Sequence, residues 1–328
     1  MNDALVSIVI LNWNGKEHLV DCLESVLQTT YAPLEIIVVD NGSTDGSVSL
    51  VRSKYASVQI LENGQNLGYA EGNNRGFQKA RGEFVVTLNN DVVVEPTWLN
   101  KPIHYLENDA RIGIVSCRQM NYYDHSLIDS LFHYPAPDLS FARVGHGEPF
   151  DPASWHNVPG YVIAPNGGSA IYRKEMFQQV GGFDIFFFAY HDETDLGMRA
   201  FLSGWKCLFV PEAVVYHKDG ASFKKTSGKA HYFHVRNKLW FMYKYFPASF
   251  IVKHLDGIAI EELRLFKRLI FKEKVPLVYL MAKVDGITGI FKYANTRKKY
   301  TGIFCQYRDD FNRLEKEKII IFDSKVTQ

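Results

Sequence analysis

The residues best suited to chemistry follow a run of five apolar or β-branched residues. Phe84–Leu88 is typical of a buried strand, and it leads directly into Asn89-Asn90-Asp91. An amide and a carboxylate therefore stand two residues apart at the carboxyl end of a strand, where parallel α/β sheets bind their ligands. Mg²⁺ or Mn²⁺ on phosphate oxygens needs only one or two protein carboxylates. We predict a metal-bound diphosphate here, and a polar turn that closes a buried strand is the alternative.

A second group of acids stands at the start of a predicted helix. Asp192, Glu193 and Asp195 fall within four residues, and Arg199 follows about two turns later on the same helix. Asp192 or Glu193 can act as a general base that takes the proton of an attacking hydroxyl. Arg199 can orient these acids or pair with Asp195. The alternative for Asp192 is a favourable interaction with the helix dipole.

Two earlier corners have residue types that suit a nucleotide. Asn12 ends the apolar run at 6–11, and Asp40 ends the run at 36–39 and precedes Gly42-Ser43-Thr44-Asp45. A carboxylate at this position can accept a hydrogen bond from a pyrimidine NH. The alternative is that Asp40 and Asp45 build an Asx-turn and cap the next helix.

A third corner runs from Asn66 to Gly76 and is dense in glycine and asparagine. Glycines such as Gly68 let the backbone approach a ligand, and a helix N-terminus suits a diphosphate or a sugar. The segment is neither a Walker A loop nor a dinucleotide fingerprint, because it lacks Gly-Lys-Ser/Thr and follows the third strand. Gly168 precedes a further strand, and His217 ends another. His217 can complete a metal site, although a lone histidine is more often structural.

The elements that must position these residues alternate between strands and helices. Short apolar runs at 6–11, 36–39, 58–61, 84–88 and 112–116 alternate with amphipathic segments such as 18–27 and 74–80. This pattern predicts an α/β fold with a mostly parallel sheet. Residues of about 118–165 show no period and are predicted to be an insert. Further strands are expected at 169–172, 206–210 and 214–217, with helices at 174–180 and 192–202.

Charge divides the chain into two unequal parts. The first 220 residues contain 15 Lys and Arg against 26 Asp and Glu, whereas residues 221–328 contain 22 against 10. The second part is therefore suited to an anionic partner. Four cysteines without a framework spacing favour a reducing compartment. We expect no secretion signal and no transmembrane helix, because charges interrupt each long apolar stretch.

Taken in order, these motifs resemble the family-2 inverting glycosyltransferases of the GT-A fold, in the bacterial rhamnosyltransferase-like branch. The resemblance covers residues 6–220 and rests on ILNWN, VVDNGSTDGS, NLGYAEGNNRG, LNND, GGFD, DETDLGMR, GW and VYH. It implies a GT-A, Rossmann-like central sheet with flanking helices in residues 1–220, and a C-terminal helical region in residues 221–328. It also implies a divalent metal, Mg²⁺ or Mn²⁺, and a nucleoside-diphosphate sugar donor.

By this resemblance, Asp40 contacts the pyrimidine base and Asn12 frames it, while Asn66, Gly68 and Gly168 belong to the donor site. Asn89 and Asp91 stand at the metal-binding D-x-D position, with His217 as a further ligand. Two departures matter. Asn89 replaces the first acid, which leaves Asp91 as the main carboxylate. The usual Glu-Asp pair is Asp192-Glu193 here, which points to Glu193 as the base and keeps Asp192 as an alternative.

The implied reaction transfers a sugar, such as rhamnose from dTDP-rhamnose or another UDP- or dTDP-sugar, to a hydroxyl of a cell-surface polysaccharide or lipid-linked glycan. A non-catalytic relative is the alternative that Asn89 favours. A sugar nucleotidyltransferase is disfavoured, because it needs a basic, glycine-rich loop after the first strand. Nucleic acid is not an expected partner, since the first two-thirds are acidic and lack a reader motif.

The C-terminal region mixes basic and aromatic residues at helical spacing, as in 236–247 and 263–274. Such helices can lie in a membrane interface, where anionic lipid attracts Lys and Arg. The alternative is a subdomain packed on the catalytic domain with a solvated basic face. The expected location is cytoplasmic, peripheral at the inner face of the cell membrane.

Overall fold

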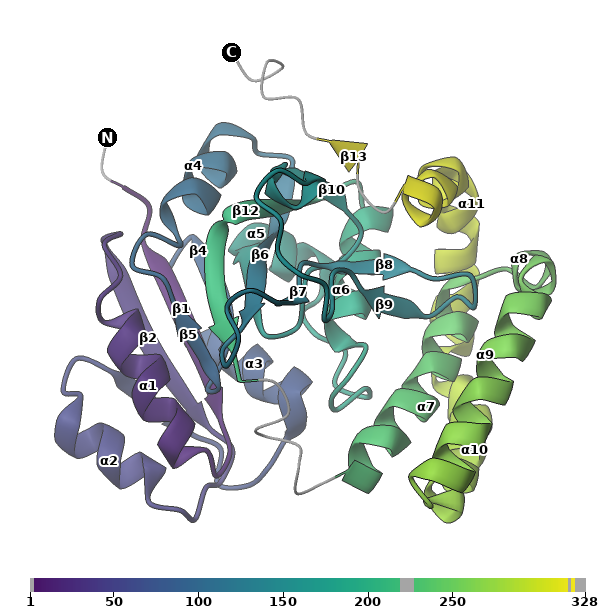
Figure 1. Ribbon diagram of the computed structural model, residues 1–328, viewed down its shortest axis with the longest axis horizontal. Coiled ribbons are helices and arrows are strands. Elements are labelled where there is room, and N and C mark those ends of the chain that lie inside the picture. The colour runs from purple at the N-terminus through teal and green to yellow at the C-terminus, as the bar shows by residue number, and fades with distance from the viewer. Residues whose placement is uncertain (1–2, 219–226, 318–319, 322–328) are drawn as a thin grey trace.

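A central sheet with helices on both faces organises the chain (Figure 1). The computed structural model describes residues 3–218, 227–317 and 320–321. The sheet contains β1 (Val6–Asn12), β2 (Leu34–Asp40), β3 (Gln59–Glu62), β4 (Phe84–Asn89), β5 (Val92–Val94), β6 (Ile112–Asn121), β7 (Ile128–Ser130), β10 (Gly160–Val162), β11 (Ser169–Arg173), β12 (Lys206–His217) and β13 (Ile320–Ile321). A separate hairpin consists of β8 (His133–Pro135) and β9 (Phe141–Arg143).

The helices fall into two groups, before and after residue 220. The first group is α1 (Lys16–Val26), α2 (Ser47–Lys54), α3 (Gly68–Lys79), α4 (Asn100–Asn108), the 3₁₀ helix η1 (Trp155–Asn157), α5 (Lys174–Val180) and α6 (Asp192–Leu202). The second group is α7 (Ser227–Tyr245), α8 (Ala248–Lys253), α9 (Leu255–Lys267), the π-helix η2 (Arg268–Lys272), α10 (Pro276–Gly289), the 3₁₀ helix η3 (Ile290–Tyr293) and α11 (Ala294–Glu317).

The strand order is β13-β10-β12-β6-β11-β4-β1-β2-β3. Strands β3, β2, β1 and β4 are parallel, and so are β6 and β12, whereas β11 runs antiparallel between β4 and β6. The predicted α/β fold with a mostly parallel central sheet is confirmed. The register pairs Asn12 with Asp40 and Leu11 with Asn89, which aligns three of the predicted polar corners along one edge of the sheet.

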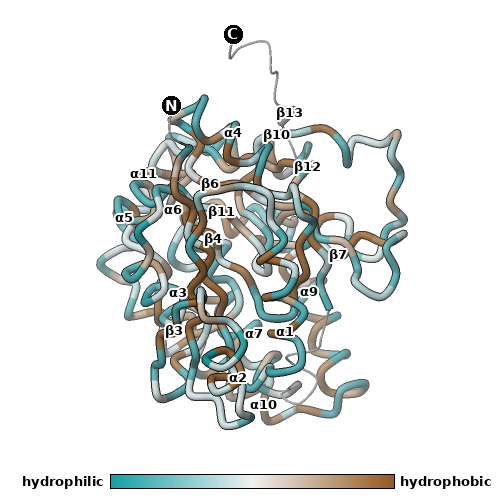
Figure 2. The backbone as a smooth tube through the Cα atoms, turned by 90° about the vertical axis from the view of Figure 1, so that its left-hand side faces the viewer, coloured by the Kyte–Doolittle hydropathy of each residue, from teal (hydrophilic) through white to brown (hydrophobic). Residues whose placement is uncertain are grey.

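The parallel strands are buried on both faces because their apolar residues alternate between two cores. Ile8 and Ile10 pack with α1 and α4, whereas Val9 packs with Phe77 of α3 and Phe177 of α5. The tube in Figure 2 is correspondingly brown, the hydrophobic end of its scale, through the central strands around β4. Continuous apolar runs therefore predicted these strands well.

Three local expectations differ from the structure. The strands expected at 206–210 and 214–217 form one strand, β12, with a register shift between Val210 and Val214. Pro211 lies inside that shift, where a proline is tolerated in a sheet. Helix α3 begins at Gly68 rather than at residue 74, so the glycine- and asparagine-rich corner supplies its first two turns. The insert contains β7, β8, β9 and β10, whose three-residue lengths are too short to show a period.

The C-terminal helices pack against the first part of the chain through a third core. The first part of the chain contributes Phe187, from the loop before α6, and Met198, from α6 itself. The second part contributes Trp240 of α7, Phe246 just after α7, and Phe304 of α11. The predicted domain boundary between residues 220 and 221 lies outside the described residues. Within the described chain, no helix combines the length and the apolar character needed to cross a membrane.

Candidate active site

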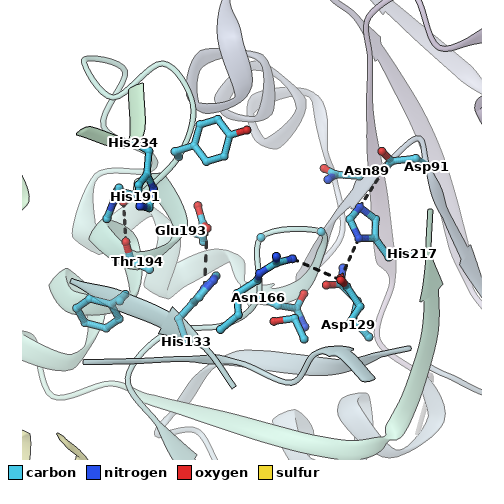
Figure 3. Close-up of a pocket in the computed structure, with 17 residues that line it drawn as sticks. Asn89, Asp91, Asp129, His133, Asn166, His191, Glu193, Thr194, His217 and His234 are labelled. Atoms are coloured by element: carbon cyan, nitrogen blue, oxygen red, sulfur yellow. Dashed lines mark hydrogen bonds and ion pairs between the residues drawn. The ribbon is translucent and has the colours of Figure 1, made fainter. Parts of the chain in front are cut away.

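A cavity of about 550 Å³ opens between the carboxyl ends of the central strands, the β8–β9 hairpin and the start of α6 (Figure 3). Five of the predicted site residues line it: Asn89, Asp91, Gly168, Glu193 and His217. They come from four separate segments of the sequence, and the sheet brings them together. This cavity is therefore the candidate active site.

One wall of the cavity is an aspartate–histidine–aspartate chain. His217 Nε2 lies 3.5 Å from Asp91 Oδ1, and His217 Nδ1 lies 2.9 Å from Asp129 Oδ2. Burial disfavours the imidazolium, but the hydrogen bonds to both carboxylates outweigh it and raise the pKa of His217 to about 10. The proton on His217 thus supplies positive charge between two buried carboxylates. The same pair of carboxylates would favour a bound cation.

The donor set on this wall suits a divalent metal. Asp91 offers a carboxylate and His217 an imidazole whose second nitrogen bonds to a carboxylate, the arrangement that orients histidine ligands in metalloproteins. Among residues 3–218, 227–317 and 320–321, no group of three or more His, Cys, Asp or Glu side chains is arranged to hold a metal. A metal at Asp91 and His217 would therefore replace the proton on His217 Nε2 and take its remaining ligands from phosphate oxygens and water.

The opposite wall contains Glu193. Figure 3 shows Glu193 and His133 across the cavity from Asp91 and His217. Glu193 Oε1 lies 3.9 Å from His133 Nδ1, and the Glu193 side chain retains 14% of its exposure. It is thus a carboxylate in the first turn of α6 that faces the space where a substrate would bind.

Asp192, the alternative base, has a different environment from its neighbour. It is 1% exposed and does not line the cavity, and its Oδ2 atom has no hydrogen-bond partner among the residues that the structure describes. Burial raises the pKa of Asp192 well above its ordinary value, and the adjacent Glu193 raises it further. The structure therefore favours a protonated Asp192 beside Glu193.

The loop before Glu193 has an unusual backbone. Phe188, Tyr190 and His191 all have left-handed φ angles, between 64° and 67°. Such angles cost energy in residues other than glycine and persist only where the surroundings impose them. Asn237 of α7 holds the backbone of this loop in place. Its Nδ2 donates to the carbonyls of Phe187, Ala189 and Tyr190 at 2.8 to 3.0 Å.

The predicted nucleotide corner is a network of buried polar groups. Asn12 Nδ2 lies 3.1 Å from Asp40 Oδ1, and Asn90 Nδ2 donates to Asn12 Oδ1 at 2.7 Å. Asp40 Oδ2 also accepts from the amides of Gly42 and Ser43, which is the Asx-turn that the sequence offered as the alternative. Asn12 and Asp40 do not line the cavity described above.

The α3 corner is occupied by the loop before α6. Asn66 Oδ1 accepts from the amide of Gly68, whose φ of 81° suits glycine. A Cβ at Gly68 would lie 2.4 Å from the carbonyl oxygen of Phe188, which accepts from the amides of Tyr69 and Ala70. Those two amides are engaged within the protein, contrary to the expectation of an open helix N-terminus for a diphosphate.

Asp195 and Arg199 form an internal ion network and do not line the cavity. Asp195 is fully buried and bonds to Arg199 Nε at 2.8 Å, Lys244 Nζ at 2.7 Å and the Tyr245 hydroxyl at 2.6 Å. Burial opposes its ionisation, but Lys244 and Arg199 outweigh this effect and lower the pKa of Asp195. The two residues therefore join α6 to α7.

Several lining residues were not singled out in the sequence. They come from the insert, from the segments before β11 and α6, and from α7: Gln119, Asp129, Ser130, His133, Phe141, Arg143, Asn166, Tyr190, His191 and His234. The insert is rich in Tyr, His and Asp, but no spacing rule marks individual members. Within the described residues, Gln119 Nε2, Ser130 Oγ and both ring nitrogens of His191 are buried without a hydrogen-bond partner, so polar groups in this cavity are available to a ligand.

Comparison with known proteins gives consistent matches. Residues 7–181, more than half of the chain, match the family described as Glycosyl transferase family 2, and residues 152–227 match Glycosyl transferase family group 2. An N-acetylglucosaminyl-diphospho-decaprenol L-rhamnosyltransferase from Mycobacterium tuberculosis is 29% identical over 254 residues, which are 68% of this chain and 78% of that protein.

Solved structures share the fold. GalNAc-T7 with UDP, GalNAc and Mn²⁺ aligns with a TM-score of 0.62 at 18% identity, covering 80% of this chain and 51% of that chain. Staphylococcus aureus TarS residues 1–349 with UDP-GlcNAc aligns with a TM-score of 0.58 at 14% identity, covering 93% and 92%. At these identities the similarity establishes a common GT-A architecture.

Proposed function

Because the chain belongs to glycosyl transferase family 2 and is a glycosyltransferase, we propose that it transfers a sugar from a nucleoside-diphosphate donor, with inversion, to a hydroxyl of a lipid-linked or cell-surface glycan. This proposal rests on the arrangement of side chains on two opposite walls of one cavity. Glu193 faces Asp91 and His217 across it (Figure 3). Inversion requires the attacking hydroxyl and the departing diphosphate on opposite sides of the anomeric carbon.

In the proposed reaction, the acceptor oxygen attacks the anomeric carbon as its bond to the donor diphosphate breaks, and the hydroxyl proton passes to Glu193. Asp91 and His217 would hold a divalent metal, which would offset the charge that develops on the leaving diphosphate. Asn12, Asp40, Asn66, Gly68, Asn89 and Gly168 are assigned to the donor side, either in contact with it or as its framework. Asp195 and Arg199 are assigned as positioning residues that fix α6.

The rhamnosyl relative suggests dTDP-rhamnose as the first donor to test and a sugar diphosphate lipid as the first acceptor. The test is a binding and turnover screen with UDP- and dTDP-sugars, with and without Mn²⁺ or Mg²⁺. Asp91→Ala should lose metal-dependent donor binding, and Glu193→Gln should keep binding but lose turnover. Absence of nucleotide-sugar binding under every condition would overturn the proposal.

We also propose that the C-terminal helices contact an anionic membrane surface. Twelve of the eighteen exposed large apolar side chains in the described chain lie between Val252 and Phe291. On α10 they recur at helical spacing: Leu277, Leu280, Met281, Val284 and Ile287. Exposed lysines at 253, 267, 272, 274 and 292 flank them. An apolar face edged by cations fits an interface of anionic lipid.

A further inference from the structure

A second cavity lies beside the candidate active site. Its volume is about 340 Å³, and it is bounded by the tip of the β8–β9 hairpin, α7, α9 and η2. Its lining residues are Asp138, Ser140, His234, Lys238, Glu261, Arg264, Leu265 and Arg268. His234 lines both cavities, so the two are contiguous at that side chain. Figure 3 places His234 on the Glu193 side, away from Asp91. The second cavity therefore adjoins the side from which the acceptor would attack.

Cationic side chains outnumber carboxylates in this cavity, three to two. Lys238 is buried and pairs with Asp138 at 2.5 Å, and Arg264 pairs with Glu261 on its own helix. Arg268, one turn beyond Arg264, has no carboxylate within 4.0 Å in the part of the chain that the structure describes. Arg264 and Arg268 are at i and i+4, so both can reach one ligand from the same helical face.

Lys238 also lies 3.8 Å from Glu262, so Arg268 is the cation of this cavity that forms no ion pair within the described chain. Burial lowers the pKa of His234 to about 4, and the nearby charges of Lys238 and Arg268 contribute to the shift. Helix α9, which supplies Arg264 to the cavity, also carries the exposed side chains of Ile260, Leu263 and Phe266. The cavity thus combines guanidinium groups, which suit phosphate geometry, with an adjoining apolar surface. A ligand matching both features carries phosphate next to a hydrocarbon chain.

We propose that this cavity binds the phosphate groups of an amphiphilic acceptor, a sugar linked through a diphosphate to a prenyl chain, with Arg264 and Arg268 as its ligands. The acceptor sugar would extend past His234 toward Glu193, and the prenyl chain would leave along α9. This inference rests on the proposed function for the position of the acceptor hydroxyl. The phosphate-binding step itself does not require turnover, so it can be tested separately.

The experiment measures binding of farnesyl diphosphate to the full chain by titration calorimetry, with EDTA present so that no metal assists the donor side. Arg268→Ala and Arg264→Ala should each weaken binding about tenfold or more, the size expected for a hydrogen bond to a charged group. Arg308→Ala removes the same guanidinium group from an exposed position of α11 outside the cavity, and its binding should stay within about twofold of wild type. Farnesol, which lacks phosphate, should not compete.

Three results would overturn the inference. The first is that farnesyl diphosphate does not bind to the wild-type chain, and the second is that Arg308→Ala weakens binding as much as Arg268→Ala does. The third is that Arg268→Ala weakens binding to phosphatidylglycerol vesicles as much as it weakens binding to farnesyl diphosphate. The last result would assign the arginines to lipid headgroups instead. Binding of a nucleotide sugar with Mn²⁺ is measured in parallel. If that binding fails while farnesyl diphosphate binds, the proposed function fails and the phosphate cavity stands.

Discussion

Asp192 and Glu193 are adjacent carboxylic acids, yet their surroundings favour only Glu193 as the proposed general base. Glu193 lines the cavity, whereas Asp192 is buried outside it. We expect Glu193→Gln to lower kcat by about 10²- to 10⁴-fold, the usual contribution of a general base, with donor affinity unchanged. Asp192→Asn should keep most of the activity, because a protonated carboxyl and an amide are similar in shape. Single-turnover rates and donor titrations check both. A larger loss in Asp192→Asn would reverse the assignment.

The pH dependence of stability separates Asp192 from Asp195, which share a helix but have opposite pKa shifts. A raised pKa stabilises the fold below the ordinary Asp pKa of about 3.9, and this contribution is lost as pH rises through the raised value. Asp192→Asn should therefore increase the free energy of unfolding at neutral pH. This free energy should also decrease less with rising pH in the variant than in the wild type. Urea unfolding at pH 5 and pH 8 measures this, and an Asp192→Asn chain less stable than wild type at pH 8 would contradict it.

Asp195 should behave in the opposite way. Its lowered pKa stabilises the fold above pH 3.9 or so, and that contribution is lost as pH falls through the lowered value. Asp195→Asn leaves Arg199 buried with a neutral partner, whereas Lys244 keeps its ion pair with Asp184 at 2.9 Å. The variant should therefore cost about 3–5 kcal/mol of unfolding free energy at neutral pH. The surface pair of Arg313 and Glu317 is the matched control, and Glu317→Gln should change stability by about 0.5 kcal/mol or less.

At the scale of elements, α7 holds the loop that positions Glu193. Asn237 donates to three carbonyls of residues 187–190, and these bonds fix three left-handed residues before α6. Asn237→Leu should remove these three hydrogen bonds and lower kcat about tenfold or more, while the donor dissociation constant stays unchanged. Asn295→Ala, an exposed helical position, is the control. Parallel losses of kcat and donor affinity would indicate general unfolding instead of a positioning role.

The elements also show what the sequence could predict. Strand β4 and helix α6 were located closely because each has a strong local pattern: a continuous apolar run, and acids followed by helical periodicity. The short strands β7, β8 and β9 have no such pattern, since three residues are held mainly by their partners. Asp129 and His133 lie on these strands, so their place in the cavity depends on contacts distant in the sequence.

At the scale of the whole molecule, the charge division found in the sequence corresponds to a division of surfaces. The acidic first part supplies all described lining residues of the candidate active site except His234, and the basic second part contains α9 and α10 with most of the exposed apolar side chains. Packing alone does not explain those side chains, because the third core already buries the contact between the two parts. An exposed apolar face of this extent indicates an interaction surface.

The proposed membrane contact predicts the effect of substitutions on α10. Leu280→Glu and Val284→Glu each replace an exposed apolar side chain with a negative charge on the proposed lipid-facing side. Each should weaken pelleting with phosphatidylglycerol vesicles about tenfold or more, since an apolar contact is lost and the anionic lipid repels the carboxylate.

Leu27→Glu, at the end of α1, makes the same change on another surface and should bind vesicles as wild type does. Donor binding in solution should be equal in all four proteins, because α10 does not line the active-site cavity. Equal vesicle binding by the α10 variants and wild type would overturn the proposed membrane contact of α10.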